Sequence, residues 1–95
     1  MRLIGKNRMA NFKREHPDAL EQVSAWEKEI EAADWKSPHD LKTRYPKASL
    51  LGNQQVVFNM CWNNYRIWVE IAYRTGVVMV KEAGTHKEYE KWDIK

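Results

Sequence analysis

Tyr65-Arg66-Ile67-Trp68-Val69-Glu70-Ile71-Ala72-Tyr73 is the stretch that decides the fold of this chain. Its odd-numbered side chains are apolar or aromatic and are expected to face a core, because successive side chains of a β-strand point to opposite faces. Arg66 and Trp68 are then expected to share the outer face. Asn63-Asn64 before the stretch and Thr75-Gly76 after it are turn signals. The stretch is therefore predicted to be a central strand of an antiparallel sheet.

The segments on either side of this strand predict further strands. Gln54 to Cys61 precede it, Val77 to Ala83 follow it, and Gly52-Asn53 marks another turn after the short run Ser49-Leu50-Leu51. Connections this short join antiparallel neighbours, so the carboxyl-terminal half is expected to be a β-meander. In this interpretation Cys61 lies within a strand and serves packing.

The amino-terminal half carries helix signals. Met1 to Ile4 suits a brief strand, and a helix is expected from about Lys6 to Glu15, ending near His16-Pro17. Asp18 to Glu21 has the pattern of a capping box. Apolar residues then recur at steps of three and four, which predicts a second helix with one buried face: Leu20, Val23, Trp26, Ile30 and Ala33.

Two shorter helical segments complete the prediction. Ser37-Pro38 is a start signal for a helix from Pro38 to Arg44. Thr85 and Glu88 form another capping-box pattern, which predicts a short helical turn through about Trp92. With 95 residues the chain suits one domain, residues 1–95. The expected fold class is α+β, a small antiparallel meander with two N-terminal helices on one face and a short C-terminal helical turn.

The charge of the chain is unevenly distributed. The formal net charge is +3, yet residues 18–34 carry six acidic groups and one basic group, whereas residues 35–95 carry ten basic and six acidic groups. The acidic face of the second helix is either an ordinary solvated surface or a docking surface for a basic partner. It is expected to contact a protein or the first helix rather than RNA, because its carboxylates repel phosphate.

Composition excludes several classes of protein. A single cysteine allows no intramolecular disulfide and no four-cysteine zinc site, which favours a reducing compartment. No apolar run approaches the roughly 20 residues that span a bilayer, so a cytoplasmic protein without a membrane partner is expected. His16, His39 and His86 are isolated, and each glycine stands alone. No metal and no cofactor are therefore expected.

Candidate functional side chains gather toward the carboxyl end: Arg66, Arg74, Lys81, His86, Lys87 and Tyr89. In an antiparallel pair Arg66 lies roughly opposite Gly84, so Arg66 and His86 are expected to approach each other. Cleavage of RNA without a metal requires a base, an acid and positive charge on the phosphate, which histidine, tyrosine, lysine and arginine can supply.

Structural roles remain open for each of these residues. His86 is equally well an ordinary cap-region residue, and Arg66 can pair with Glu70 or Glu82. Tyr89 can be a packed aromatic. Trp62 and Trp68 can stack on bases or pack against side chains. From the residues alone, the chain is a candidate RNA-binding protein.

The ordered motifs W-x-x-P-x-D-L-K (from Trp35), F-N…N-x-Y-R (from Phe58) and G-T-H-x-E-Y (from Gly84) resemble the HigB toxin family of the RelE/ParE superfamily. That resemblance covers nearly the whole chain and implies a RelE-like fold. It also implies the toxin of a type II toxin-antitoxin module, an endoribonuclease that cuts messenger RNA on the ribosome by metal-independent attack of the 2′-hydroxyl. The implied partners are messenger RNA, the ribosome and a helix-turn-helix antitoxin of the HigA type.

The resemblance also implies roles for individual residues. Arg66 would stabilise the scissile phosphate, and His86 and Tyr89 would transfer protons. Substrate-binding candidates are Lys81, Arg74, Lys87, Asn63 and Trp68. Two other functions remain in competition: a ParE-like toxin that inhibits DNA gyrase by protein contact without cutting nucleic acid, and a non-catalytic RNA-binding remnant.

Overall fold

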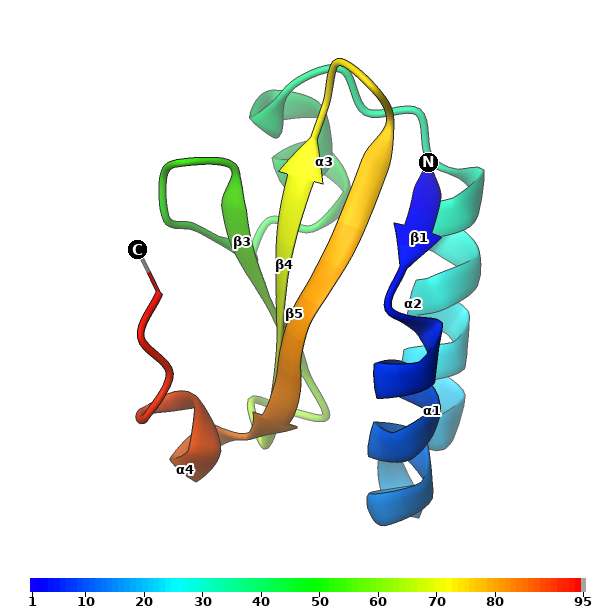
Figure 1. Cartoon of the computed structure of the whole chain (residues 1–95), viewed down its shortest axis with the longest axis vertical. Coiled ribbons are helices and arrows are strands. Elements are labelled where there is room, and N and C mark those ends of the chain that lie inside the picture. Colours follow the sequence, from blue (N-terminus) through cyan, green and yellow to red (C-terminus); the bar gives the residue numbers. More distant parts are fainter. Residues whose placement is uncertain (95) are drawn as a thin grey trace.

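The computed structural model describes residues 1–94, and a five-stranded sheet in the order β1-β5-β4-β3-β2 forms its centre (Figure 1). The strands are β1 (Arg2–Ile4), β2 (Ser49–Leu50), β3 (Gln55–Met60), β4 (Tyr65–Ala72) and β5 (Val77–Thr85). The helices are α1 (Lys6–Glu15), α2 (Leu20–Ala32), α3 (Pro38–Arg44) and α4 (His86–Tyr89), with a 3-10 turn at Pro17–Ala19. The predicted α+β class is confirmed.

Strands β2 to β5 pair in antiparallel order and form the predicted meander. The sheet as a whole is mixed, however, because β1 joins its edge parallel to β5, with Leu3 opposite Val78. Gly5 permits this arrangement. Its φ is 104°, and a Cβ at this position would lie 2.9 Å from the Cβ of Val80, so only glycine lets the chain turn from β1 into α1 directly against β5.

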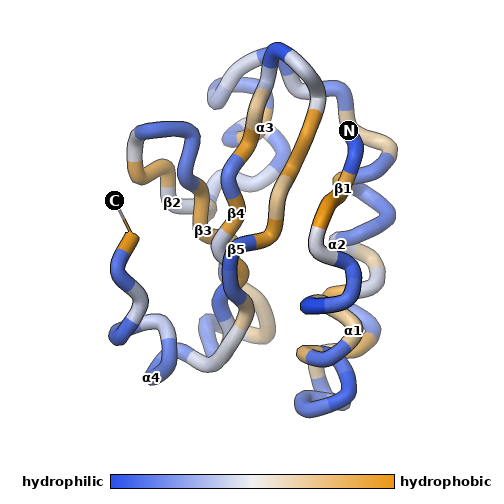
Figure 2. The backbone as a smooth tube through the Cα atoms, viewed as in Figure 1, coloured by the Kyte–Doolittle hydropathy of each residue, from blue (hydrophilic) through white to orange (hydrophobic). Residues whose placement is uncertain are grey.

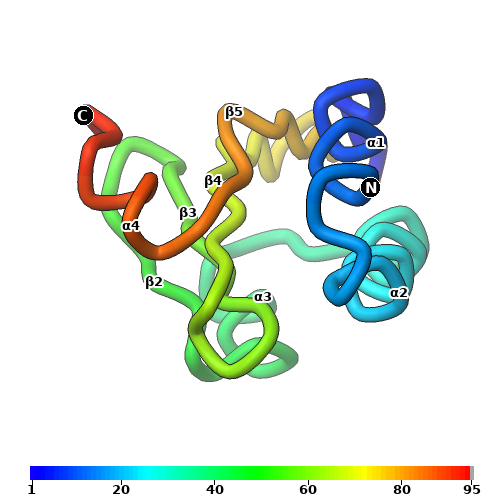
Figure 3. Tube along the Cα trace, turned by 90° about the horizontal axis from the view of Figure 1, so that it is seen from below, coloured from blue at the N-terminus to red at the C-terminus, as the bar shows by residue number. Residues whose placement is uncertain are grey.

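Helices α1 and α2 lie side by side and antiparallel along one face of the sheet, whereas α4 lies at the other side of the molecule (Figures 1 and 3). Hydropathy alternates along β4, as Figure 2 shows. Its odd-numbered residues from Tyr65 to Ile71 are buried, and its even-numbered residues are partly exposed, as predicted. The helices bury their apolar faces against this side of the sheet, where the largest core side chains are Met9, Trp26, Ile30, Leu41, Phe58, Ile67 and Ile71.

The capping box predicted at Asp18 to Glu21 is wrong. Helix α2 begins at Leu20, and its N-terminus has no side-chain cap. The Asp18 carboxylate instead accepts a hydrogen bond from the hydroxyl of Tyr65, at 2.8 and 2.9 Å from its two oxygens. A tertiary partner thus replaces the local backbone donor that the sequence pattern indicated.

The turn between β3 and β4 is longer than predicted, and Cys61 does not lie in a strand. Cys61, Trp62 and Asn63 all have left-handed backbone conformations, with φ of 51°, 58° and 73°. The connection therefore spans residues 61–64, where the sequence predicted a turn at Asn63-Asn64 alone. The C-terminal helix also ends earlier than predicted, at Tyr89, three residues before Trp92.

Candidate functional site

The candidate site lies at the end of the sheet where β4 begins and β5 runs into α4. Arg66 pairs with Gly84 in the β4–β5 register, which places the start of α4 beside it. Arg66 Nη2 lies 3.0 Å from His86 Nδ1, so the predicted approach of these two side chains is confirmed. The sheet register brings the two residues together across 20 positions of sequence.

The guanidinium of Arg66 is held by several neighbours. Its Nη1 donates to the backbone carbonyl of Asn63 at 2.6 Å and to that of Tyr65 at 3.3 Å. Its Cζ lies 5.4 Å from the centre of the Tyr89 ring, within the range of a cation–π contact. The alternative partners do not bind it: Glu82 pairs with Arg8, and Glu70 accepts a hydrogen bond from Gln55. Neither of these two carboxylates therefore pairs with Arg66.

The contacts of His86 define which ring nitrogen carries the hydrogen. A guanidinium has no acceptor, so Arg66 donates to Nδ1, and neutral His86 must carry its hydrogen on Nε2. Nε2 lies 3.3 Å from Glu90 Oε1, one helical turn later, and the His86 side chain is 54% exposed. The ring is thus oriented by a cation on one side and a carboxylate on the other while remaining open to solvent.

A capping box fixes the start of α4. The Glu88 backbone N–H donates to Thr85 Oγ1 at 3.1 Å, and the Thr85 backbone N–H donates to Glu88 Oε1 at 2.9 Å, as predicted. The hydrogen bonds from Thr85 to its carboxylate hold the pKa of Glu88 below its ordinary value. Gly84 allows this close packing, because a Cβ there would lie 3.0 Å from Glu88 Oε1.

Aromatic rings form one side of the site. The rings of His86 and Tyr89 are 6.2 Å apart, and Trp92 meets Tyr89 edge to face at 5.7 Å. Trp92 also lies 6.1 Å from Trp68 on the outer face of β4. Trp92 was not among the predicted site residues, because it follows the end of α4 and no periodicity in the sequence indicates its position. Glu90 was not among the predicted site residues, although its spacing of four from His86 was a usable signal.

A second anchor lies behind β4. Tyr65, which precedes Arg66 and points to the opposite face, donates its hydroxyl to Asp18. The hydrogen bond to Asp18 raises the pKa of Tyr65. Its ring packs on Phe12 and His16, with centroids 5.4 and 4.8 Å away. The amino-terminal helices therefore hold the residue next to Arg66.

The predicted substrate-binding residues are only partly gathered. Asn63 touches Arg66 through its carbonyl, and Lys87 is exposed on α4. Lys81 occupies an irregular position of β5, between the residues that pair with Trp68 and Val69, and its Nζ lies 4.0 Å from Glu70 Oε1. Lys81 thus stands on the outer face but is partly engaged by a carboxylate.

The expectation that Arg74 joins this cluster is wrong. Arg74 follows β4 in the turn to β5, whereas Arg66 stands near the start of β4. Six residues of extended chain, from Arg66 to the end of β4 at Ala72, span about 20 Å, and Arg74 lies beyond that end. Figure 1 shows the β4–β5 turn at the end of the sheet opposite α4. The prediction placed Arg74 in the cluster because it follows the same strand as Arg66. The strand runs away from the site, however, so its far end and Arg74 lie at the opposite end of the sheet.

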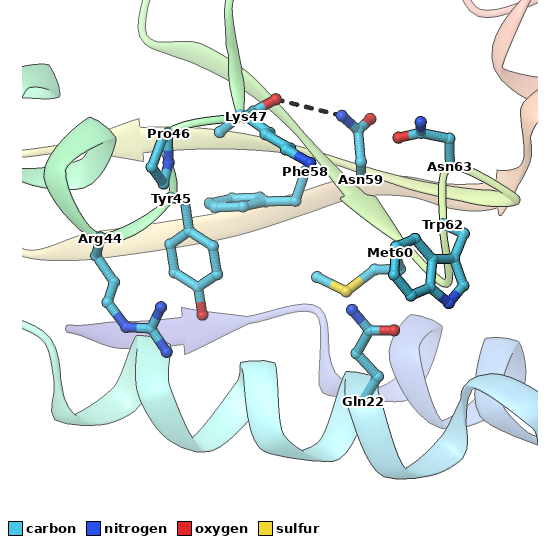
Figure 4. Close-up of a pocket in the computed structure, with 11 residues that line it drawn as sticks. Gln22, Arg44, Tyr45, Pro46, Lys47, Phe58, Asn59, Met60, Trp62 and Asn63 are labelled. Carbon is cyan, nitrogen blue, oxygen red and sulfur yellow. Dashed lines mark hydrogen bonds between the residues drawn. The ribbon is translucent and has the colours of Figure 1, made fainter.

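A groove of about 530 Å³ lies next to the site, between the residues after α3 and the end of β3 (Figure 4). Tyr45 and Phe58 line its middle, and Arg44 and Trp62 stand at its opposite ends. Burial and a hydrogen bond to Glu29 raise the pKa of Tyr45 well above its ordinary range. Tyr45, Phe58 and Met60 give the groove a mainly apolar and aromatic floor.

Within residues 1–94, no group of three or more histidine, cysteine, aspartate or glutamate side chains is arranged to hold a metal ion. Over the same residues, no helix combines the length and the apolar character that crossing a membrane requires.

Comparison with known families gives one match. Residues 19–92 match the model of the HigB toxin family, described as the RelE-like toxic component of a toxin-antitoxin system. This span is well over half of the chain and includes Arg66, His86, Tyr89 and Glu90. No curated protein matches the chain.

Proposed function

The chain belongs to the HigB toxin family, the RelE-like toxic component of toxin-antitoxin systems, and we propose that it is an endoribonuclease that cuts messenger RNA. The observation that supports this activity best is the 3.0 Å contact between Arg66 Nη2 and His86 Nδ1, with the Tyr89 ring beside both. A fixed positive charge thus lies next to two side chains that can transfer protons.

The proposed reaction uses the RNA as its own nucleophile. A base on the enzyme takes the proton of a 2′-hydroxyl, and the 2′-oxygen forms a bond to the adjacent phosphorus. The bond from phosphorus to the 5′-oxygen breaks, and an acid protonates the departing oxygen. The products are a 2′,3′-cyclic phosphate and a free 5′-hydroxyl, and the step requires no metal.

Each residue takes a role that its contacts support. Arg66 stabilises the charge that builds on the phosphate oxygens, because its guanidinium is already oriented by two backbone carbonyls. His86 and Tyr89 are the proton-transfer groups. Glu90 is a positioning residue that holds His86 Nε2. Lys81 and Lys87 bind flanking phosphates, Asn63 shapes the site through its carbonyl, and Trp68 supports the aromatic side with Trp92.

The partners follow from the family and from this chemistry. Membership in a toxin-antitoxin family implies an antitoxin. We assign this antitoxin to the helix-turn-helix class and the toxin to the cytoplasm, where ribosomes present the messenger. Part of the acidic face of α2 forms salt bridges with α1: Glu27 pairs with Lys13, and Glu31 pairs with Lys6.

The test adds purified protein to a translating extract and maps new messenger ends by primer extension. New ends within coding sequence are expected with the parent, whereas Arg66→Ala and His86→Ala should lower their rate of appearance by about a hundredfold or more. Lys36→Ala is the matched control, since Lys36 is 74% exposed and pairs only with Asp34 in the described chain.

Absence of new ends with the parent protein would contradict the proposal. A parallel gyrase supercoiling assay separates the competing functions. Inhibition of gyrase together with an intact messenger would identify a ParE-like mode of action, and unchanged growth on expression of the parent would identify a non-catalytic remnant.

A further inference from the structure

The turn between β3 and β4 holds a tryptophan in an unusual state. Trp62 is 96% exposed, although burial of a side chain of this size is strongly favourable. It is also the middle of three consecutive non-glycine residues in left-handed backbone, Cys61, Trp62 and Asn63. Such conformations cost free energy for residues with a side chain and persist only where the surroundings hold them.

Hydrogen bonds from several parts of the chain hold this turn. The Cys61 backbone N–H donates to Gln22 Oε1 at 2.9 Å, and the Asn64 backbone N–H donates to the Cys61 carbonyl at 3.0 Å. Arg66 Nη1 donates to the Asn63 carbonyl at 2.6 Å. The residue that presents the proposed charge to the phosphate thus also fixes the residue next to Trp62. The backbone that presents the exposed ring is therefore linked directly to the proposed site.

The groove next to Trp62 has a chemistry suited to single-stranded RNA. Trp62 stands at its mouth with Met60 and Gln22 beneath, and Lys47 stands on the rim (Figure 4). The Lys47 carbonyl accepts a hydrogen bond from Asn59, which fixes its backbone, and its side chain is exposed. Among residues 1–94, no carboxylate lines this groove. Exposed aromatic rings beside cations are the features that bind unpaired bases and their phosphates.

We propose that Trp62 stacks on a base of the RNA strand next to the scissile phosphate and that the strand continues into the groove past Lys47. The inference rests on the proposed nuclease function, because it takes the Arg66–His86 pair as the place of cleavage. It adds a subsite outside that pair, on the other side of the β3–β4 turn. Stacking is tolerant of base identity, so Trp62 contributes affinity and position more than sequence choice.

The experiment titrates the intact protein with a short single-stranded oligonucleotide of 2′-deoxynucleotides, which lacks the nucleophile and is not cut. Stacking should quench the fluorescence of Trp62, one of five tryptophans. Trp62→Ala should bind about tenfold more weakly or worse, and Trp62→Phe should stay within about threefold of the parent. Ile4→Ala is the control, because Ile4 is an exposed apolar residue on the opposite edge of the sheet.

Lys47→Gln provides an independent measurement. Loss of one phosphate contact on a single strand should flatten the slope of log affinity against log salt by about 0.7. Lys36→Gln should leave that slope unchanged. Equal slopes for the parent and Lys47→Gln would place the strand outside the groove and overturn this part of the inference.

The outcomes separate this inference from the proposed function. If the parent cuts messenger but Trp62→Ala binds the oligonucleotide as tightly as the parent does, the subsite is wrong and the nuclease function stands. If the oligonucleotide binds through Trp62 but no messenger is cut, the nuclease function is wrong. A Trp62→Ala variant that loses only its affinity for the antitoxin identifies the groove as a protein-docking surface and overturns the inference.

Discussion

Arg66 and His86 are joined through one nitrogen each, with Arg66 Nη2 3.0 Å from His86 Nδ1. The β4–β5 register supplies this contact, since Arg66 faces Gly84 and the chain turns into α4 directly afterwards. The same guanidinium reaches the Asn63 carbonyl through Nη1. The planar fork of an arginine can serve both partners at once, and a lysine ammonium cannot hold this geometry.

Replacement of Arg66 by lysine should therefore impair cleavage even though the charge remains. We expect Arg66→Lys to lower the rate of messenger cleavage by about tenfold or more, because an ammonium lacks the planar fork that reaches His86 and the Asn63 carbonyl together. The rate of appearance of new ends in a translating extract measures this. A lysine variant as active as the parent would show that only net charge matters.

A second prediction concerns which ring nitrogen of His86 carries the hydrogen. When the imidazole is neutral, nitrogen-15 NMR should show the hydrogen on Nε2, because Nδ1 accepts from Arg66 and Nε2 faces Glu90. Arg66→Ala should release this preference and give a mixture of both tautomers. A hydrogen on Nδ1 in the parent would contradict the orientation described for the site.

The stability that the capping box gives to the start of α4 should depend on pH. The pKa of Glu88 is lowered in the folded state. The stability that its carboxylate contributes is therefore fully present above the pH at which an ordinary glutamate titrates, and it is lost as the pH falls through the folded pKa. Thr85→Ala should cost about 1 kcal/mol of local stability at neutral pH. Glu88→Gln should cost less, and its difference from the parent should disappear as the pH falls through the lowered folded pKa of Glu88. Amide hydrogen exchange at Thr85 reports both effects, and a constant difference at all pH values would refute the linkage.

The hydroxyl of Tyr65 should stabilise the fold and leave chemistry at His86 intact. Tyr65→Phe keeps the ring contacts with Phe12 and His16 but removes the donor to Asp18. The expected loss is about 1 kcal/mol in the free energy of unfolding. Urea denaturation measures it, and the rate of messenger cleavage below the transition should change by less than about threefold. A much larger loss of cleavage would mean that Tyr65 takes part in the reaction.

The thiol of Cys61 should react slowly with alkylating reagents. Burial, followed by the charge of Asp18, raises the pKa of Cys61, so less thiolate is present at a given pH than for a free cysteine. The midpoint of the rate of alkylation against pH should lie above the ordinary cysteine value. Asp18→Asn should move that midpoint down, and an unchanged midpoint would leave burial as the sole cause.

Much of the site was accessible to prediction because it depends on short-range patterns. Alternation along residues 65–73 placed Arg66 on the outer face, and the turn at Thr75-Gly76 brought it opposite Gly84. Thr85 and Glu88 predicted the start of α4, because a capping box is closed within four residues. Family motifs then suggested His86 and Tyr89.

The errors have a common physical origin. Asp18 matched a local cap, yet its carboxylate binds Tyr65 at a separation of 47 residues. Arg74 follows the same strand as Arg66, but an extended strand carries its two ends far apart. The sequence left open whether Trp62 stacks on bases or packs against side chains. Only the left-handed turn of the structure shows that its ring is exposed to solvent.

The sequence by itself determined the α+β class, the strand faces and the capped start of α4, because hydrophobic period and turn chemistry act over a few residues. The tertiary structure decided the parallel edge position of β1, the placement of the His86 ring beside Arg66, and the exposed turn at Trp62 beside its groove. These features depend on contacts between residues far apart in the chain, which no local pattern encodes. A free energy summed over the whole fold selects them.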